Sequence, residues 1–318
     1  MRLKVFYLLL KSARPRQWIK NLALYAALFL SGFLFYVPDT GLAYFWTVTY
    51  AFVIFCILTS SIYLINDIID AEEDSQHPYK KKRPIASGEL PIPIAAFVAM
   101  TGIALVFFLA LSLPVFFRIL VLTYLALQLL YATKLKHVPI LDVISIASGF
   151  LIRVYAGAII VELHTNVWFL LTVVSASLFL AVGKRQSEIT LLTDHKLSLS
   201  RKTLKHYSQQ LLNQYTAMFA NATWLTYALF SFQYEDLYLA DPIHQRFSNF
   251  YSLLPRTFQS QKLLMLTLPF VIFGVMRYLQ LIYEENKGES PERVLLNDMP
   301  LLTTVFLFGV VSFLIIYL

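Results

Sequence analysis

The amino-acid sequence predicts an all-α integral membrane protein with nine transmembrane helices, and two observations support this prediction. Of the 318 residues, 58% are hydrophobic and only 14% are charged, whereas an average soluble domain is about 45–50% apolar and about 25% charged. The apolar residues also gather in long runs, each close to the ~20 residues that a membrane-spanning helix requires. This composition excludes a soluble enzyme and a disordered chain. We expect a single membrane-embedded domain over residues 1–318.

Nine apolar runs are the predicted spans, and each is nearly free of charged side chains because those side chains would face lipid. The spans are Trp18–Val37, Leu42–Ile65, Ile92–Leu113, Phe116–Tyr131, Leu141–Val161, Val167–Val182, Tyr215–Phe232, Leu263–Tyr283 and Met299–Leu318. The first run is too long for the core of a signal peptide, so we interpret it as a retained span. The single cysteine, Cys56, excludes a disulfide framework.

The distribution of lysine and arginine predicts which ends of the spans face the cytoplasm. With the N-terminus placed inside, 21 of the 26 basic residues fall in the inside segments, as the positive-inside rule expects. We therefore predict a cytoplasmic N-terminus in a multi-pass protein of the inner (plasma) membrane. The same bias explains the formal net charge of +7, so this charge does not indicate a nucleic-acid partner.

Acidic side chains after the second span give the clearest chemical signal. On a helix continued from that span, Asn66, Asp70 and Asp74 share one face at i, i+4 and i+8. Asp67 joins the two aspartates at i, i+3 and i+7. Such carboxylate and amide oxygens suit Mg²⁺, which takes one or two carboxylates together with phosphate oxygens and water. The alternative, a solvated helix end, is less favoured because acids at the edge of a span are costly and usually functional.

Further polar side chains lie at or inside other spans. They are Arg14, Gln17, Lys20 and Asn21 at the first, Lys80 and Arg83 after the second, Tyr131 and Lys134 at the fourth, Asp142 and Arg153 in the fifth, and Lys184, Arg185 and Glu188 after the sixth. The basic ones either bind substrate phosphates or serve topology and attraction to anionic lipid. Arg153 lies deep in its span and needs an anionic partner or a wet cavity.

The run Asn66-Asp67-x-x-Asp70-x-x-x-Asp74 resembles the first aspartate motif of the UbiA superfamily of membrane prenyltransferases. The likeness extends over nearly the whole chain, and it is to a branch that transfers 5-phosphoribose from phosphoribosyl diphosphate to a polyprenyl phosphate. The segments that carry it are Arg14–Asn21, Asn66–Gly88, Leu135–Asp142, Ser148–Arg153, Gly183–Arg185 and Arg277–Val294.

This resemblance implies a nine-helix UbiA-type bundle around a central cavity, with Mg²⁺ as cofactor and the active site on the cytoplasmic face. It implies that Asn66, Asp67, Asp70 and Asp74 hold the metal on the donor's diphosphate, with the three aspartates as the catalytic residues. The resemblance also implies that the polar side chains at or inside the other spans bind the two substrates. These are Arg14, Gln17, Lys20, Asn21, Lys80, Arg83, Tyr131, Lys134, Asp142, Arg153, Lys184, Arg185 and Glu188. The product would be a precursor for the cell envelope or a lipid-linked sugar.

Two other functions stay open. A UbiA-type prenyltransferase would use a prenyl diphosphate and an aromatic or haem acceptor. In that class a second motif, DxxxD, follows the sixth span, where this chain has Lys184, Arg185 and Glu188. A transporter of lipid phosphate or anions would show inverted hydropathy repeats and interrupted spans, which the sequence lacks. It also lacks the HExxH, GxSxG, P-loop and GxGxxG motifs. A homo-oligomer is compatible with the sequence, which does not fix the oligomeric state or the lipid's length.

Overall fold

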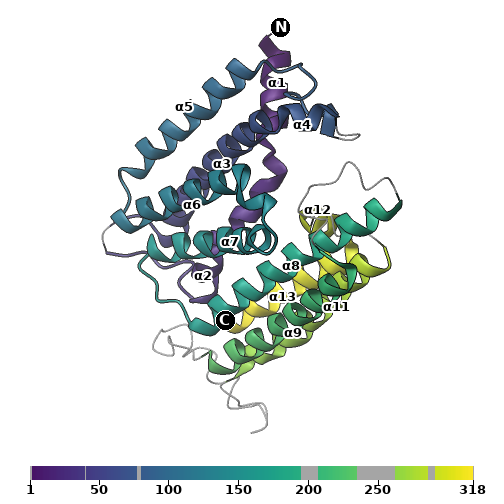
Figure 1. The fold of residues 1–318 in the computed structure, drawn as a ribbon. Helices are drawn as coiled ribbons and strands as arrows, with labels where there is room; N and C mark the ends of the chain where they lie inside the picture. Colours follow the sequence, from purple (N-terminus) through teal and green to yellow (C-terminus); the bar gives the residue numbers. More distant parts are fainter. Residues whose placement is uncertain are drawn as a thin grey trace. The chain divides into compact units, whose positions relative to one another are not determined.

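A computed structural model confirms the all-helical fold (Figure 1). It describes residues 2–39, 41–76, 80–194, 207–234, 262–285 and 291–317, and within these ranges it contains helices and no strand. Seven helices of the described chain are long and apolar enough to cross a membrane. The chain divides into two compact units, of which the first takes described residues 2–28 and 35–163 and the second takes the rest.

The first unit is built around one long central helix. Its elements are α1 (Arg2–Ala13), the 3₁₀ helix η1 (Pro15–Leu24), the start of α2 (Tyr25–Leu30), α3 (Tyr44–Ile69), α4 (Ala71–Gln76), η2 (Lys80–Lys82), α5 (Ile92–Ala110), α6 (Val115–Thr133), η3 (Leu135–His137) and α7 (Leu141–Ile159). Helix α3 packs against α1, η1, α5 and α6, as Figure 1 shows. Its side chains Ile54, Phe55 and Leu58 are fully buried there, so α3 forms the core of this unit.

The predicted first span, Trp18–Val37, is wrong as a single helix. Helix α1 ends before Arg14, which takes a left-handed backbone conformation with φ 53°, and the next ten residues form η1. A 3₁₀ helix repeats every three residues, so it places Trp18, Asn21 and Leu24 in one row. Asn21 and Leu24 are fully buried, and the Trp18 indole donates to the Ser60 hydroxyl at 3.0 Å. Packing against α3 and α7 therefore explains a geometry that apolar length alone does not predict.

Helix α7 approaches η1 closely at Gly157, and this contact supports a first prediction. A Cβ built on Gly157 would overlap the backbone carbonyl oxygen of Leu24. Overpacking of this kind typically costs about 1–3 kcal/mol, so we expect Gly157→Ala to lower the thermal midpoint of the detergent-purified protein clearly. Gly309 in the last helix, α13 (Met299–Tyr317), has open space around the same position, so Gly309→Ala is the matched control and should unfold like the parent. Equal midpoints for the two variants would contradict the contact.

The second unit is a bundle of helices with its own core. It contains α8 (Val167–Asp194), α9 (Gln209–Gln233), η6 (Leu263–Thr267), α11 (Leu268–Tyr283), α12 (Pro291–Asn297) and α13 (Met299–Tyr317). Helix α8 packs against α9, and α11 packs against α13. Phe179, Tyr278, Leu281 and Ile282 lie in the buried core between these helices.

Two of the nine predicted spans are not among the seven apolar helices. The first is replaced by η1 and α2. The other, Tyr215–Phe232, does lie in a helix, α9, but this helix begins earlier and carries glutamine and asparagine side chains in its first turns. The number nine and the cytoplasmic N-terminus therefore stay predictions, as does the single domain over residues 1–318.

Candidate active site

The predicted aspartate motif lies at the junction of α3 and α4. Helix α3 ends at Ile69, Asp70 is its C-cap and α4 begins at Ala71, so the expected continuous helix is broken at Asp70. Helical spacing survives the break, because the Asp70 amide donates to the Asn66 carbonyl at 2.9 Å and the Asp74 amide donates to the Asp70 carbonyl at 2.8 Å. The Asn66 side-chain amide also donates to Asp70 Oδ2 at 3.1 Å.

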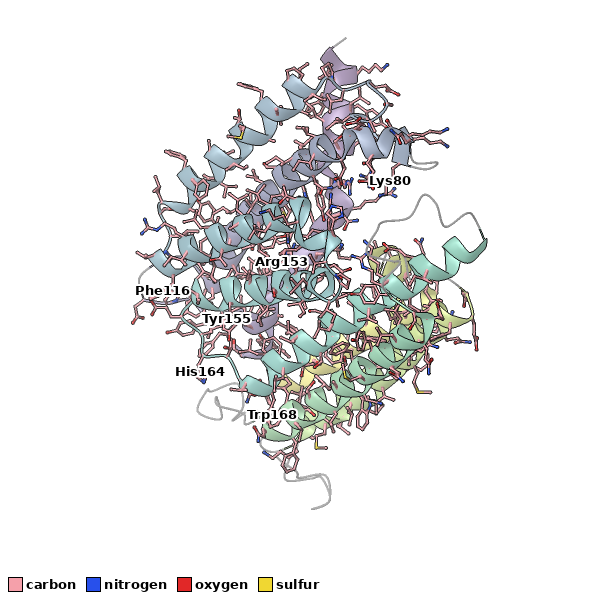
Figure 2. All side chains as sticks on the ribbon, in the orientation of Figure 1. Lys80, Phe116, Arg153, Tyr155, His164 and Trp168 are labelled. Atoms are coloured by element: carbon pink, nitrogen blue, oxygen red, sulfur yellow. The ribbon has the colours of Figure 1, made fainter. Side chains whose placement is uncertain are left out.

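Three basic side chains from two separate segments neutralise the two most buried carboxylates of this motif. The Asp67 and Asp74 side chains are only 3% and 2% exposed. Arg14 Nη2 lies 2.5 Å from Asp67 Oδ1, and Arg83 Nη1 contacts both Asp67 Oδ1 and Asp74 Oδ2. Lys80, labelled in Figure 2, lies 3.7 Å from Asp74 Oδ1. Three residues predicted to bind substrate are therefore gathered on two of the predicted metal ligands.

The third carboxylate pairs with a residue that sequence reasoning missed. Lys136 Nζ contacts Asp70 Oδ1, and the Lys136 side chain is only 7% exposed. The prediction named Lys134, whose side chain is exposed, because both lysines were counted as topology signals after the fourth span. The 3₁₀ turn η3 turns Lys136 inward, and only its place within the segment Leu135–Asp142, which carries the family resemblance, could have pointed to it. We call Asp67, Asp70 and Asp74, together with Arg14, Lys80, Arg83 and Lys136, the ion-pair cluster.

Arg14 reaches this cluster from an unusual backbone position. It is a non-glycine residue in the left-handed region, and it precedes a proline, which disfavours helical conformations for it. Its guanidinium lies 5.1 Å from the centre of the Tyr63 ring in addition to its contact with Asp67. A cation–π contact and an ion pair from α3 thus hold the junction between α1 and η1 in place.

The donor atoms of the cluster fit a hard divalent cation in their chemistry. Carboxylate and amide oxygens are the protein ligands that Mg²⁺ takes, and a single Arg83 nitrogen lies within bonding distance of both Asp67 and Asp74. Two carboxylates therefore point toward one positively charged atom. Among the described residues, no group of three or more His, Cys, Asp or Glu side chains is arranged to hold a metal. In this structure basic side chains engage the predicted metal ligands.

Arg153 lies in a second polar group of the first unit, and its partners differ from the prediction. The side chain is buried in α7, where Figure 2 labels it. Its Nε donates to Asn21 Oδ1 at 2.8 Å, Nη1 to the Gly149 carbonyl at 3.0 Å and Nη2 to the Tyr124 hydroxyl at 2.5 Å. Where an anionic partner or a wet cavity was expected, the described partners of the guanidinium are these neutral acceptors and the faces of Tyr124 and Phe150.

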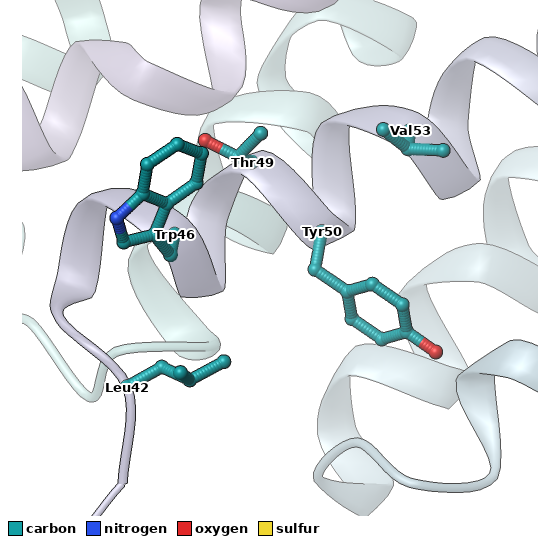
Figure 3. Close-up of a pocket in the computed structure, with 5 residues that line it drawn as sticks. All are labelled: Leu42, Trp46, Thr49, Tyr50 and Val53. Atoms are coloured by element: carbon teal, nitrogen blue, oxygen red, sulfur yellow. The ribbon is translucent and has the colours of Figure 1, made fainter.

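Other predicted residues of the first unit are placed as follows. Gln17, Lys20 and Tyr131 are half-buried, and Asp142 is buried in the first turn of α7. Residues 77–79, part of the segment Asn66–Gly88 that carries the family resemblance, lie outside the described residues. An apolar pocket of about 540 Å³ (Figure 3) lies on the first half of α3, lined by Leu42, Trp46, Thr49, Tyr50 and Val53. It carries no ionisable carboxylate or basic side chain, so we place the candidate active site at the ion-pair cluster.

The last three predicted residues belong to the second unit. Arg185 is 1% exposed and lies 2.6 Å from Glu188 Oε2 on the next turn of α8, while Lys184 is half-buried. Next to this pair, the Gln186 side-chain amide donates to Asn213 Oδ1 at 2.7 Å. Glu188, at the position where the wider family has a second aspartate motif, thus forms an ion pair with an arginine of its own helix.

Arg277, in the late segment of the family resemblance, connects two helices of the second unit. It contacts Asp298 through two nitrogens, at 3.2 and 2.6 Å, and Glu285 at 3.1 Å. Asp298 also accepts from the Leu301 amide at 2.9 Å, which caps the start of α13. This geometry gives the segment a structural role between α11 and α13.

An all-helical membrane fold with buried aspartates and cations at the end of one helix defines the class of this protein. The chain belongs to the UbiA prenyltransferase family, whose model matches residues 23–297. The predicted class, a membrane-embedded transferase, is thereby confirmed.

Three relatives of this chain carry the same name. The chain is 38% identical over 231 residues to the decaprenyl-phosphate phosphoribosyltransferase of Mycolicibacterium smegmatis, which covers 70% of each chain. It is 38% identical over 227 residues to that of Corynebacterium glutamicum, covering 70% of this chain and 67% of the relative. It is 34% identical over 229 residues to that of Mycobacterium tuberculosis (strain H37Rv), covering 70% of this chain and 73% of the relative.

Solved structures show the same fold. A UbiA homologue from Archaeoglobus fulgidus bound to GPP and Mg²⁺ matches 97% of this chain and 99% of its own, with a TM-score of 0.67 and 17% identity. The same homologue bound to DMAPP and Mg²⁺ matches with a TM-score of 0.66. At this identity the likeness concerns the fold, and it confirms the predicted UbiA-type architecture.

Proposed function

We propose that this chain is a Mg²⁺-dependent phosphoribosyltransferase that moves 5-phosphoribose from phosphoribosyl diphosphate to a polyprenyl phosphate and releases diphosphate. The names of its relatives support this activity. The observation that carries the proposal is the ion-pair cluster, where three carboxylates face four basic side chains. Carboxylates suit the metal, and the cations suit the phosphates of both substrates.

In this proposal the side chains of the ion-pair cluster change partners when the donor and Mg²⁺ bind. Asp67, Asp70, Asp74 and the Asn66 amide would hold Mg²⁺, which neutralises charge on the diphosphate leaving group. Arg14, Lys80, Arg83 and Lys136 then turn from the carboxylates to phosphate oxygens, where arginine offers paired N–H donors. The number of charged contacts is thus maintained, so these partly buried cations are not left without partners.

The reaction itself needs few groups. The bond from ribose C1 to the diphosphate oxygen breaks, and an oxygen of the lipid phosphate forms the new bond to C1. That oxygen is already anionic at neutral pH, so no side chain has to remove a proton from it. The ion-pair cluster supplies positioning and charge, which agrees with its lack of a histidine.

The location of the site follows from the charge bias of the sequence. We propose that the chain lies in the inner (plasma) membrane with the ion-pair cluster on the cytoplasmic face, where a water-soluble donor is available. The assignment of Gln17, Lys20, Asn21, Tyr131, Lys134, Asp142, Arg153, Lys184, Arg185 and Glu188 to the substrates stays a prediction.

A single assay tests the function. Purified protein is given radiolabelled phosphoribosyl diphosphate, polyprenyl phosphate and Mg²⁺, and labelled lipid and free diphosphate are measured. We expect both products only when all three are present, and none after chelation of the metal. Parallel reactions with a prenyl diphosphate and an aromatic acceptor test the alternative activity. Product in those reactions alone would overturn the proposal in favour of an ordinary prenyltransferase.

Substitution of Arg83 is expected to strengthen the binding of Mg²⁺ and to weaken the binding of the donor. Because its guanidinium contacts the same two carboxylates that would hold Mg²⁺, Arg83→Gln should let Mg²⁺ bind about fivefold more tightly, the lower end of a typical coupling between two ligands. The donor KM should rise, since a phosphate partner is lost. Metal binding is measured by the Mg²⁺ dependence of the thermal midpoint in the absence of donor.

The matched control is Lys81→Gln, which removes one positive charge from the same short segment at an exposed position. Its effect on Mg²⁺ binding should be small, because solvent and salt screen an exposed charge. Equal effects of the two variants would mean that Arg83 acts through general charge and does not compete with the metal.

A further inference from the structure

The connection between α6 and α7 contains a strained turn at Ile140. This residue has φ 71° and ψ −49°, and the Leu141 amide donates to the Pro139 carbonyl across it at 2.8 Å. A three-residue γ-turn with positive φ is rare and strained. The strain is greater for isoleucine, because a β-branched side chain crowds the backbone at positive φ.

Backbone hydrogen bonds on both sides of Ile140 hold this connection in one conformation. The His137 amide donates to the Lys134 carbonyl at 3.0 Å, the Asp142 amide to the Val138 carbonyl at 3.1 Å, and the Ile144 amide to the Ile140 carbonyl at 2.9 Å. Pro139 fixes its own φ. The strained turn is therefore held by its surroundings, which is the condition under which such strain persists.

The core does not require isoleucine at this position. Its side chain is 50% exposed, and glycine adopts positive φ without steric cost. A stiff residue thus stands where a flexible one would be unstrained. What the turn carries is Lys136, four residues earlier, with its nearly buried contact to Asp70.

The distribution of strain in the molecule agrees with a role at the cluster. Three described non-glycine residues have positive φ: Arg14, Ile140 and Glu162. Arg14 contacts Asp67 directly, and Ile140 lies in the connection that brings Lys136 to Asp70. Only Glu162, exposed after the far end of α7, is remote from the ion-pair cluster in sequence and contacts.

We propose that Ile140 is a positioning residue, whose rigid γ-turn fixes the backbone that carries Lys136. The Lys136 ammonium then lies beside Asp70 in the absence of donor and meets the donor's diphosphate at a defined place. Isoleucine makes the turn strained but rigid, whereas glycine would make it unstrained but mobile. The part that concerns the donor rests on the proposed function, whereas the fixation of Lys136 does not.

Ile140→Gly tests the proposal with two readouts. The first is the rate at which an amine-acylating reagent modifies Lys136 in the purified protein, measured by mass spectrometry relative to exposed Lys134. We expect Ile140→Gly to raise this ratio about tenfold, as expected for a local opening that becomes easier. The second is kinetic: donor KM should rise about tenfold while kcat changes less than threefold, because misplaced positioning weakens binding of the correctly oriented substrate.

Control variants separate positioning from general effects. Glu162→Gly relieves the same kind of backbone conformation away from the cluster and should leave both readouts unchanged. Ile140→Val keeps β-branching and should behave like the parent. Ile140→Asn, which tolerates positive φ better than isoleucine, should give intermediate values and serves if the glycine variant does not fold.

The outcomes are distinguishable from failure of the proposed function. Unchanged Lys136 modification in Ile140→Gly, or a raised modification rate with an unchanged donor KM, would overturn the proposal. If the parent protein transfers no phosphoribose, the proposed function fails, and the Lys136 modification ratio alone then decides whether Ile140 fixes this lysine.

Discussion

Asp74→Asn is expected to reduce phosphoribosyl transfer at least about 100-fold, since even outer-shell changes at metal sites cost 10–100-fold. Asp74 is one of the two most buried carboxylates of the ion-pair cluster and faces both Arg83 and Lys80. Asparagine keeps the shape and the capacity to accept a hydrogen bond, but it removes the charge that would hold Mg²⁺. The loss should appear in initial rates of labelled-lipid formation at saturating donor and metal.

Glu73→Gln is the matched control for this variant. Glu73 lies one position earlier in the same short helix, and its side chain is exposed. The same loss of one negative charge should there change the rate less than twofold. A large loss in both variants would indicate a general effect of charge near the membrane, and full activity in Asp74→Asn would exclude Asp74 as a metal ligand.

Arg153→Met is expected to lower the free energy of unfolding by about 2–4 kcal/mol. Methionine fills a similar volume, but it leaves Asn21 Oδ1, the Gly149 carbonyl and the Tyr124 hydroxyl without the guanidinium. Each buried polar group that loses its partner costs about 1–3 kcal/mol. The effect should appear as a lower thermal midpoint and a larger aggregated fraction in size-exclusion chromatography.

Two variants interpret this result. Arg16→Met changes an exposed arginine of η1 and should leave the thermal midpoint within the error of the parent. Tyr124→Phe removes one acceptor while the ring stays beneath the guanidinium, so we expect a smaller loss of about 1 kcal/mol. A midpoint for Arg153→Met equal to that of Arg16→Met would show that the buried network does not stabilise the fold.

Apolar length predicted most of the fold, because a helix in lipid must satisfy its backbone internally and needs a fixed number of residues. It failed for the first span, where Asn21 and Leu24 pack against other helices and favour a 3₁₀ row. That choice depends on Gly157, which is more than 130 residues away and permits the close approach. Hydropathy along one segment carries no signal of such a partner.

The spacing of the acidic residues along the sequence predicted the core of the candidate site. A spacing of four residues places Asn66, Asp70 and Asp74 on one side of a helix. Carboxylates this close together repel one another unless cations lie among them, and Arg14 and Arg83 supply these cations. Lys136 was missed because two lysines follow the same helix, and a single 3₁₀ turn decides which of them is buried. The neutral partners of Arg153 could not be predicted, because neutral acceptors and aromatic faces leave no charge pattern in the sequence.

The contact between Asp70 and Lys136 joins residues 66 positions apart, and α5 and α6 lie between them. Both are apolar enough to cross a membrane, so two crossings bring the chain back to the face from which it left. During synthesis the Arg14–Asp67 pair has both partners as soon as α3 has emerged, whereas Asp70 waits until the ribosome has delivered the hairpin of α5 and α6. A nascent chain therefore completes its charge balance only after this hairpin has inserted, and correct insertion becomes a condition for a complete ion-pair cluster.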